Sequence, residues 1–255
     1  MNTKFRQKLK DRKLQIGTIL SLPSPEIAEI FSGAGLDWLF LELEHSVMSL
    51  GEAQTIVQAS SQTPVVIRVP SIDEVWIKKA LDIGPAGIII PQVQTADDAE
   101  RVIELCKYPP QGKRTVGIAR AQGYGEKFQE YVSNANENTA VILMIEHVNA
   151  VKNIADIINV AGIDCLFIGP YDLSTSMNKA GQTTHPDIQS AIAQVKENAE
   201  RANIPLGIFG ATSEAVKPYI QSGYTLIAVS VDTMMLGKVA KEIREKCSDF
   251  EGAGG

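Results

Sequence analysis

Residues 64–93 read PVVIRVPSIDEVWIKKALDIGPAGIIIPQV and contain one complete strand–helix–strand unit. The apolar runs PVVIRVP (64–70) and GIIIPQV (87–93) flank the helix-like stretch DEVWIKKALDIG (73–84). Strands that are apolar throughout, without alternation, are expected where both faces of a sheet are covered. Strands that alternate with helices form parallel sheets. The stretch therefore predicts a parallel sheet with helices packed on it.

The same alternation repeats along the whole chain. Further strand-like runs, each followed by a helix-like stretch, occupy residues 16–22, 38–45, 140–147, 165–170, 205–210 and 225–232. Eight such units in about 250 residues match a single closed (β/α)₈ (TIM) barrel. A doubly wound open sheet is the alternative, but it would show a Gly-rich turn after its first strand, where this chain has SLPSPE (21–26). We expect one catalytic domain over residues 1–250, with residues 251–255 as a disordered tail or a remnant of the expression vector.

Two connections are longer than the others, residues 109–139 and residues 171–186. Long loops in a compact domain are usually lids or binding elements. We interpret both as segments that follow strands, and therefore expect both on the barrel face that carries active sites.

Composition excludes several kinds of function. The 255 residues are 44% hydrophobic and 21% charged, which indicates a globular protein, and the net charge of −6 argues against nucleic acid as a partner. The basic N-terminus has no apolar core behind it, and no apolar run reaches the roughly 18 residues that a membrane span needs. The three cysteines, Cys106, Cys165 and Cys247, lack metal-ligand spacing, and a cytoplasmic location is expected.

Polar residues stand at the carboxyl ends of most predicted strands, where barrel enzymes place their active sites. They are Glu42, Glu44, His45, Arg68, Gln92, Glu146, His147, Asp172 and Asp232.

Glu146 and Asp172 form the best candidate pair among these residues. They are 26 positions apart, about one strand–helix unit, so they are expected on neighbouring strand ends. Two convergent carboxylates that leave positions open to water and substrate oxygens suit a divalent cation such as Mg²⁺ or Mn²⁺. The alternative is that each carboxylate caps a neighbouring helix.

Arg68 and His45 each allow more than one role. Arg68 interrupts an apolar strand, where it needs an anionic partner: either a structural salt bridge to Glu42 or Glu44, or a clamp on a substrate carboxylate or enolate. His45 suits a general base, a metal ligand or a rim residue. No lysine stands at a strand end, which argues against a Schiff-base aldolase.

Several segments together resemble a known family. They are LELEHS (41–46), VVIRVP (65–70), IKKALDIGPAGIIIPQV (77–93), KYPPQGKRTVGIARAQGYG (107–125), MIEHVNAV (144–151) and FIGPYDLS (167–174) with the later HP (185–186). In this order they are similar to the metal-dependent (class II) 2-oxo-acid aldolases typified by 4-hydroxy-2-oxoheptanedioate aldolase, in the phosphoenolpyruvate/pyruvate barrel superfamily. The similarity runs from about residue 15 to residue 235.

The resemblance implies roles for individual residues. Glu146 and Asp172 match the two metal-binding carboxylates, and Arg68 matches the arginine that stabilises the pyruvate enolate. His45 matches the histidine that transfers protons with a metal-bound water. Asp82 matches an aspartate that assists this histidine across a subunit boundary.

The resemblance also implies that Gly169, Pro170, Tyr171 and Asp172 hold the pyruvate carboxylate. The implied activity is cleavage or formation of 4-hydroxy-2-oxo acids, to or from pyruvate and an aldehyde, through a metal-bound enolate. The implied cofactor is Mg²⁺, Mn²⁺ or Co²⁺. The implied assembly is a hexamer, a trimer of dimers, in which residues 233–246 pack on a neighbour as an exchanged helix.

Two alternatives remain for the function. One is a lyase of the same superfamily that acts on acyl-CoA thioesters, and the other is a non-catalytic barrel that binds small carboxylates. Three positions depart from the family pattern: Glu42 stands where Asp is usual, Met144 where Gln is frequent, and Pro85 where Ala is usual.

Overall fold

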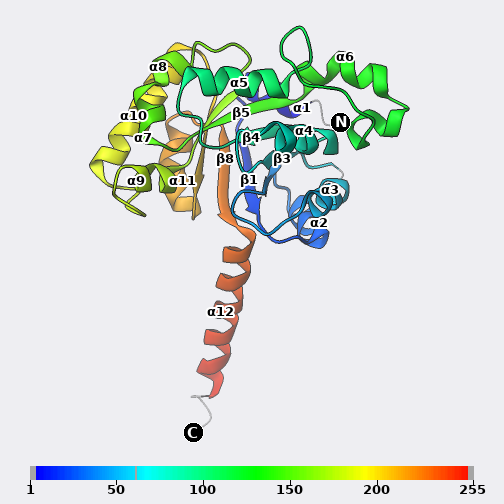
Figure 1. Ribbon diagram of the computed structural model, residues 1–255. Coiled ribbons are helices and arrows are strands. Elements are labelled where there is room, and N and C mark those ends of the chain that lie inside the picture. Colours follow the sequence, from blue (N-terminus) through cyan, green and yellow to red (C-terminus); the bar gives the residue numbers. More distant parts are fainter. Residues whose placement is uncertain (1–3, 61, 252–255) are drawn as a thin grey trace.

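The computed structural model describes residues 4–60 and 62–251, and it contains a closed barrel of parallel strands ordered β1 to β8 (Figure 1). The predicted (β/α)₈ barrel is confirmed. Of the predicted tail, Glu251 ends a helix and residues 252–255 lie outside the described residues. The strands are β1 (Gln15–Leu20), β2 (Trp38–Glu42), β3 (Val65–Arg68), β4 (Gly87–Ile90), β5 (Ala140–Ile145), β6 (Cys165–Ile168), β7 (Leu206–Gly210) and β8 (Leu226–Val231).

Helices connect the strands and cover most of the outside of the barrel. They are α1 (Lys4–Lys10), α2 (Pro25–Gly33), α3 (Leu50–Ala59), α4 (Glu74–Ile83), α5 (Ala96–Cys106), the 3₁₀ helix η1 (Arg120–Gly125), α6 (Phe128–Asn138), α7 (Val148–Lys152), α8 (Ile154–Ile157), α9 (Pro170–Ser176), α10 (Pro186–Arg201), α11 (Ser213–Gln221) and α12 (Asp232–Glu251).

The strands are buried on both faces, as their apolar sequences predict. In β2, Leu39 and Leu41 belong to the cluster between the barrel and its helices, whereas Trp38 and Phe40 belong to the cluster inside the barrel. This alternation follows from the two-residue period of a strand. Trp38, Phe40 and Phe167 fill the barrel interior, and the rings of Phe40 and Phe167 meet edge to face at 5.7 Å.

Helix α1 closes the end of the barrel at which the strands begin. Its Phe5 and Leu9, one helical turn apart, are fully buried in the interior cluster, and the Phe5 ring lies 6.1 Å from that of Trp38. Arg6 donates to Asp164 at 2.7 Å, and Asp164 accepts the backbone N–H of Val141 in β5. The basic N-terminal segment is thus a structural plug, which the sequence analysis did not predict.

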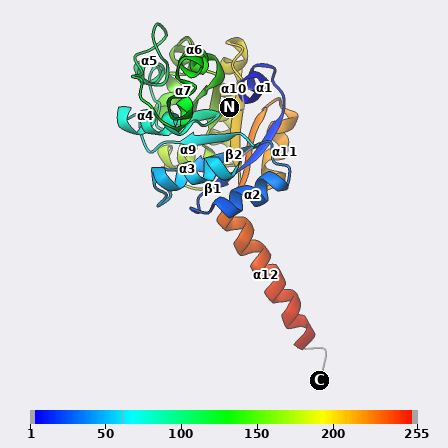
Figure 2. The same cartoon turned by 90° about the vertical axis from the view of Figure 1, so that its right-hand side faces the viewer.

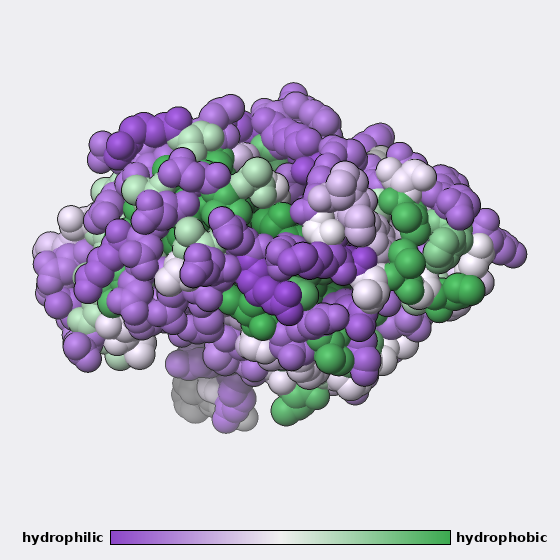
Figure 3. All heavy atoms as spheres, turned by 45° about the horizontal axis from the view of Figure 1, so that its top comes forward, coloured by the Kyte–Doolittle hydropathy of each residue, from purple (hydrophilic) through white to green (hydrophobic). Residues whose placement is uncertain are grey.

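The segment 109–139 corrects one expectation. It follows α5, not a strand, and precedes β5, so it lies at the N-terminal end of the barrel, opposite the predicted active-site face (Figure 1). Arg6 of α1 donates to the carbonyl of Glu137 in α6 at 2.8 Å. Figure 3, which tips this end toward the viewer, is hydrophilic over most of the face, with hydrophobic residues gathered on the side of α6. The segment 171–186 does follow β6, as expected.

Helix α12 continues directly from β8 and stands away from the barrel (Figures 1 and 2). Its first residue, Asp232, is fully buried and accepts the backbone N–H groups of Ser21 and Leu22, which anchors the helix beside the loop after β1. Beyond this anchor α12 exposes the large apolar side chains of Met234, Leu236, Val239 and Ile243, and the last three form a row along one face of the helix. None of the helices within the described chain has the length and apolar composition needed to cross a membrane.

We predict that Phe5→Ala lowers the free energy of unfolding by about 3–5 kcal/mol, because it leaves a cavity in the interior cluster. Urea denaturation followed by circular dichroism measures this change. The matched control is Leu14→Ala, because Leu14 is 45% exposed, and that change should stay within about 0.5 kcal/mol. Equal midpoints for the two variants would contradict the role of α1 as a plug.

Candidate active site

A cavity of about 330 Å³ opens where the strands end, at the end of the barrel from which α12 leaves. It brings together most of the predicted site residues: His45, Arg68, Gly169, Pro170, Tyr171 and Asp172. Glu146 adjoins it, since a Cβ on Gly169 would lie only 3.1 Å from Glu146 Oε2. Glycine at position 169 therefore gives the space that the carboxylate needs.

Glu42 and Arg68 form a buried ion pair on neighbouring strands. The two residues are register partners in the β2–β3 pairing, and their side chains are only 4% and 8% exposed. Arg68 Nε donates to Glu42 Oε2 at 2.5 Å, and Nη2 lies at the same distance from this oxygen. Glu42 Oε1 accepts the backbone N–H groups of Glu44 and His45 at 2.6 and 2.8 Å. One carboxylate thus holds both Arg68 and the loop that carries His45.

The remaining nitrogen of Arg68, Nη1, lies 3.3 Å from Glu44 Oε2 and 3.4 Å from Met144 Sδ. Two roles were open for Arg68, a salt bridge or a substrate clamp. The structure shows the salt bridge, and it also places Arg68 in the cavity lining. Met144, the departure on β5, accepts a weak hydrogen bond from this guanidinium.

The two carboxylate oxygens of Glu146 differ in their hydrogen bonding. Its Oε1 accepts the backbone N–H of Gln92 at 2.8 Å, whereas Oε2 is buried without a hydrogen-bond partner among the described residues. Burial raises the pKa of Glu146 to about 7; the Gln92 hydrogen bond opposes the shift, and the charge of Glu44 adds to it. A buried carboxylate oxygen of this kind is chemically suited to a cationic partner.

From the sequence, Glu44 was considered only as a possible salt-bridge partner of Arg68, and the structure places this carboxylate beside His45 as well. Burial raises its pKa to about 7, against the opposing charge of Arg68, and the charges of Glu42 and Asp172 raise it further. Its Oε2 lies 3.8 Å from His45 Nε2. The sequence carried one signal for this role, the two-residue spacing of Glu42 and Glu44 at the end of a predicted strand. In the structure β2 ends at Glu42, so Glu44 lies just beyond the strand.

The histidines separate into two kinds. His45 lines the cavity with a side chain that is 62% exposed. His147 and His185 are helix N-caps, since each Nδ1 accepts a backbone N–H two residues on, from Asn149 and Asp187. Both side chains therefore have a structural role as helix caps. The Glu146 carboxylate binds the loop after β4 and caps no helix, and α9 has no side-chain cap hydrogen bond.

Asp82 lies away from the other predicted site residues in this chain. It is the penultimate residue of α4, at the N-terminal end of the barrel, and it accepts a hydrogen bond from Arg114 Nη2 at 2.8 Å. Its predicted action on His45 was placed across a subunit boundary, so it requires a second copy and stays a prediction.

The carboxylates at the cavity fit a divalent cation. Glu42, Glu44, Glu146 and Asp172 are gathered around one guanidinium, so the fully ionised cluster carries a formal charge of −3. Across residues 4–60 and 62–251, His, Cys, Asp and Glu side chains form no group of three placed to hold a metal ion. Glu146 and Asp172 would supply two ligands, and oxygens of water or substrate the others, as Mg²⁺ accepts.

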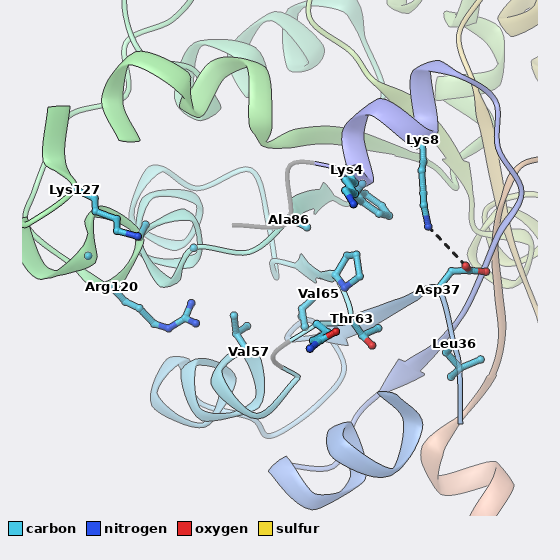
Figure 4. A pocket seen from close by; sticks show the side chains of 16 residues that line it. Lys4, Lys8, Leu36, Asp37, Val57, Thr63, Val65, Ala86, Arg120 and Lys127 are labelled. Carbon is cyan, nitrogen blue, oxygen red and sulfur yellow. Dashed lines mark ion pairs between the residues drawn. The ribbon is translucent and has the colours of Figure 1, made fainter. Parts of the chain in front are cut away.

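A second hollow, of about 880 Å³, lies at the opposite end of the barrel between α1, η1 and the loop before β3 (Figure 4). Lys4, Lys8, Arg120 and Lys127 stand around it, and Lys8 pairs with Asp37 at 3.9 Å. None of the predicted site residues lines it in the described chain. The candidate active site is therefore the smaller cavity.

A closed parallel barrel with ionisable groups gathered at the strand ends defines a TIM-barrel enzyme site. The HpcH/HpaI aldolase/citrate lyase family matches residues 15–238. The chain belongs to this family and is one of its aldolases, which are carbon–carbon lyases.

Known proteins are similar over nearly the whole chain. The 4-hydroxy-2-oxo-heptane-1,7-dioate aldolase of Shigella sonnei (strain Ss046) is 37% identical over 247 residues, which cover 95% of this chain and 94% of that protein. A HpcH/HpaI aldolase/citrate lyase family protein from Burkholderia cenocepacia J2315 superposes with a TM-score of 0.93 at 32% identity, covering 97% of this chain and all of that one. A HpcH/HpaI aldolase from Desulfitobacterium hafniense DCB-2 superposes with a TM-score of 0.88 at 30% identity, covering 95% and 96%.

We predict that Glu146→Gln stabilises the metal-free protein at pH 8. The folded state binds the Glu146 proton more tightly than the unfolded state, so its stabilising effect is present below about pH 4.5 and is lost as pH rises through about 7. Removing the charge should then raise the free energy of unfolding by about 3 kcal/mol at pH 8 and by little near pH 4.5.

Urea denaturation in EDTA at the two pH values measures the difference. Glu197→Gln is the control, because Glu197 is an exposed residue of α10 that pairs only with Arg201 one turn away. A Glu146→Gln variant no more stable than wild type at pH 8 would show that the carboxylate is not strained by burial.

Proposed function

We propose that this protein is a divalent-metal-dependent aldolase that cleaves 4-hydroxy-2-oxo acids to pyruvate and an aldehyde, and forms them in reverse. The observation that carries the proposal is the buried, unpartnered Oε2 of Glu146 beside Asp172 in a cavity that Arg68 and His45 also line. Membership of the family and relatives named for a 4-hydroxy-2-oxo acid support it.

Glu146 and Asp172 would hold the cation, Mg²⁺, Mn²⁺ or Co²⁺. When bound, such an ion supplies Lewis-acid polarisation of the 2-oxo group. Its positive charge would also lower the raised pKa values of the Glu44 and Glu146 carboxyl groups, because a nearby cation favours their ionised forms.

Arg68 stabilises negative charge as the C3–C4 bond breaks. The bonding electrons pass toward the 2-oxo oxygen, and the guanidinium that would face this charge lines the cavity and is held at Nε and Nη2 by Glu42. A donor fixed in advance needs little reorganisation during the reaction. The backbone of residues 169–172, at the start of α9, would hold the substrate carboxylate, because a helix N-terminus favours an anion.

His45 would take the proton of the 4-hydroxyl group through a water molecule, and would return a proton to C3 of the enolate. Its backbone N–H donates to Glu42, and its exposed ring lines the cavity with Nε2 3.8 Å from Glu44 Oε2. In a homo-oligomer Asp82 of a second copy would orient this ring.

We further propose that the protein assembles as a hexamer, a trimer of dimers, in which α12 packs on a neighbouring copy. The support is the row of exposed apolar residues on a helix that leaves its own barrel (Figure 2). The reaction needs only small acids and aldehydes, and the cytoplasm stays the expected location. A cavity of about 330 Å³ favours such substrates over an acyl-CoA thioester.

We predict that the protein exchanges the C3 protons of pyruvate in D₂O when Mg²⁺ or Mn²⁺ is present, and stops when EDTA is added. Exchange needs only the enolate-forming half of the reaction, so NMR can follow it without the aldehyde. Glu146→Ala and Asp172→Ala should each slow exchange by more than about a hundredfold, because several kcal/mol of charge stabilisation are lost.

Asp187→Ala is the matched control, since this exposed carboxylate pairs with Lys179 outside the cavity, and its exchange rate should equal that of wild type. Exchange that survives EDTA or either alanine substitution at full rate would refute the metal assignment. A metal that binds without any exchange would instead favour the non-catalytic barrel.

We predict that Val239→Glu combined with Ile243→Glu reduces the molar mass measured by light scattering after size exclusion. Charges in the apolar row of α12 would prevent its burial on a second copy. Lys241→Gln, on the same helix at an exposed polar position, should leave the mass unchanged. A monomeric wild-type protein would contradict the assembly.

A further inference from the structure

Residues 107–114, KYPPQGKR, form a closed loop between α5 and η1 that ends in a buried arginine. The backbone N–H of Arg114 donates to the carbonyl of Lys107 at 2.9 Å, which brings the two ends of the loop together. A Cβ on Gly112 would clash with the same carbonyl, so the loop needs glycine at this position. The ammonium group of Lys107 donates to the carbonyl of Asn136 in the last turn of α6 at 2.9 Å. These contacts fix the course of the loop and the place of Arg114.

Arg114 lies between two aromatic rings and has one charged partner. Its side chain is 1% exposed, and its Cζ lies 4.6 Å from the centroid of the Tyr108 ring and 5.7 Å from that of Tyr131. Nη1 donates to the Tyr131 hydroxyl at 3.3 Å and Nη2 donates to Asp82 Oδ1 at 2.8 Å. Nε is buried without a hydrogen-bond partner among the described residues. Within residues 4–60 and 62–251, Asp82 is the single carboxylate that pairs with this guanidinium.

The position of Arg114 is better explained by orientation than by stability. Replacing a buried ion pair with apolar side chains of similar volume is often neutral or stabilising, because both charges lose their hydration. The unpartnered Nε is a further unfavourable contribution. A planar guanidinium, in contrast, binds a carboxylate from a fixed direction, which an apolar side chain cannot do. The contacts with both tyrosines therefore set the direction from which Arg114 holds Asp82.

The second oxygen of Asp82 is left for a partner outside the chain. The Asp82 side chain is 22% exposed, and its Oδ2 makes no hydrogen bond or ion pair with any described residue. The segment with η1 packs on this end of α4, since a Cβ on Gly84 would lie 3.1 Å from the Cα of Ala121. The same segment leaves three large apolar side chains more than half exposed: Val116, Ile118 and Tyr124. Exposed apolar side chains of this kind suit a face that a second copy covers.

We propose that Arg114 is a positioning residue of the reaction: it holds Oδ1 of Asp82 so that Oδ2 accepts the imidazole N–H of His45 in a second copy. The inference rests on the proposed function, in which His45 moves protons and Asp82 of another chain orients its ring. A carboxylate held in this way fixes the tautomer and the orientation of the histidine. Loss of Arg114 should therefore slow turnover without weakening pyruvate binding, because Arg68 and residues 169–172 are unchanged.

A double-mutant cycle tests whether Arg114 acts through Asp82. Exchange of the C3 protons of pyruvate in D₂O with Mn²⁺ is measured for Arg114→Gln, Asp82→Ala and the double variant. Arg114→Gln should lower kcat about tenfold to a hundredfold and leave KM for pyruvate unchanged within about twofold. In the Asp82→Ala background the same substitution should have almost no further effect, because the residue through which it acts is gone. Equal losses of kcat in both backgrounds would overturn the proposal.

Two further variants separate positioning from general damage. Arg101→Gln removes an exposed arginine of α5 that pairs with exposed glutamates, and its kcat should equal that of the parent chain in both backgrounds. Circular dichroism and the molar mass show whether each variant is folded and assembled. If Arg114→Gln does not fold, Arg114→Lys repeats the cycle with a smaller loss, because lysine keeps the charge but cannot hold Asp82 and Tyr131 together.

Mixed oligomers test which copy Arg114 serves. Two chains with different affinity tags are expressed together, and mixed oligomers are isolated on both tags in turn. Arg114→Gln mixed with His45→Ala should exchange pyruvate protons about tenfold faster or more than either variant alone, because one site can combine His45 of one chain with the intact Arg114–Asp82 pair of the other. Asp82→Ala mixed with His45→Ala should recover in the same way.

The remaining pair, Arg114→Gln mixed with Asp82→Ala, should not recover, because each chain then lacks an intact Arg114–Asp82 pair. Recovery in this pair but not in Arg114→Gln with His45→Ala would mean that Arg114 serves the site of its own chain, which would overturn the proposal. Failure of Asp82→Ala with His45→Ala to recover would overturn it as well, since Asp82 would then not act across the boundary.

Exchange by the wild-type protein separates this inference from the function on which it rests. Metal-dependent exchange by the wild type, together with a full rate for Arg114→Gln, would refute the positioning role alone. Absence of exchange by the wild type with Mg²⁺, Mn²⁺ and Co²⁺ would refute the proposed function, and the role of Arg114 with it.

Discussion

The ion pair between Glu42 and Arg68 is the interaction on which the site depends. Parallel pairing of β2 with β3 makes these residues register partners, so barrel closure itself sets them side by side. Either charge alone would be costly at this depth, and removal of one partner from such a pair typically costs about 3–5 kcal/mol. The second oxygen of Glu42 binds the backbone of Glu44 and His45, so the same carboxylate that neutralises Arg68 also sets the course of the loop that carries His45.

The ion pair uses the charge of Arg68, so the other carboxylates of the site are left without a matching positive charge. Burial raises the pKa values of Glu44 and Glu146 to about 7, and the charge of Arg68, which already pairs with Glu42, only partly opposes this shift. A fold selected only for stability would have replaced a buried oxygen such as Glu146 Oε2. The buried carboxylates that lack a partner lie at the cavity. Unsatisfied groups of this kind are typical of functional sites.

The sequence predicted the barrel and the convergence of the strand-end residues, because both follow from periodicity and from the rule that parallel strands end at one face. It did not predict the place of the segment 109–139, because the segment was counted as following a strand, although α5 (Ala96–Cys106) lies between it and β4 and returns the chain to the opposite end of the barrel. Helix α1 was missed because Phe5 and Leu9 stand alone among charged residues, and only tertiary packing shows their burial. The sequence left Glu42 and Glu44 as alternative partners of Arg68, whereas the structure pairs Arg68 with both and makes Glu42 its register partner.

The plug at one end of the barrel explains the small size of the cavity at the other. Phe5 and Leu9 from α1, with Trp38, Phe40 and Phe167, fill the interior up to the level of the reactive groups, so the space that remains is shallow. Phe40 also lies under the guanidinium of Arg68, with the ring centroid 5.3 Å from Cζ, so the interior packing supports Arg68 directly. The Phe40 ring also meets the Phe167 ring edge to face, and both rings line the cavity. The side chains that pack the core therefore also set the volume left for the substrate. A change at Phe40 or Phe167 would alter both the packing and this volume.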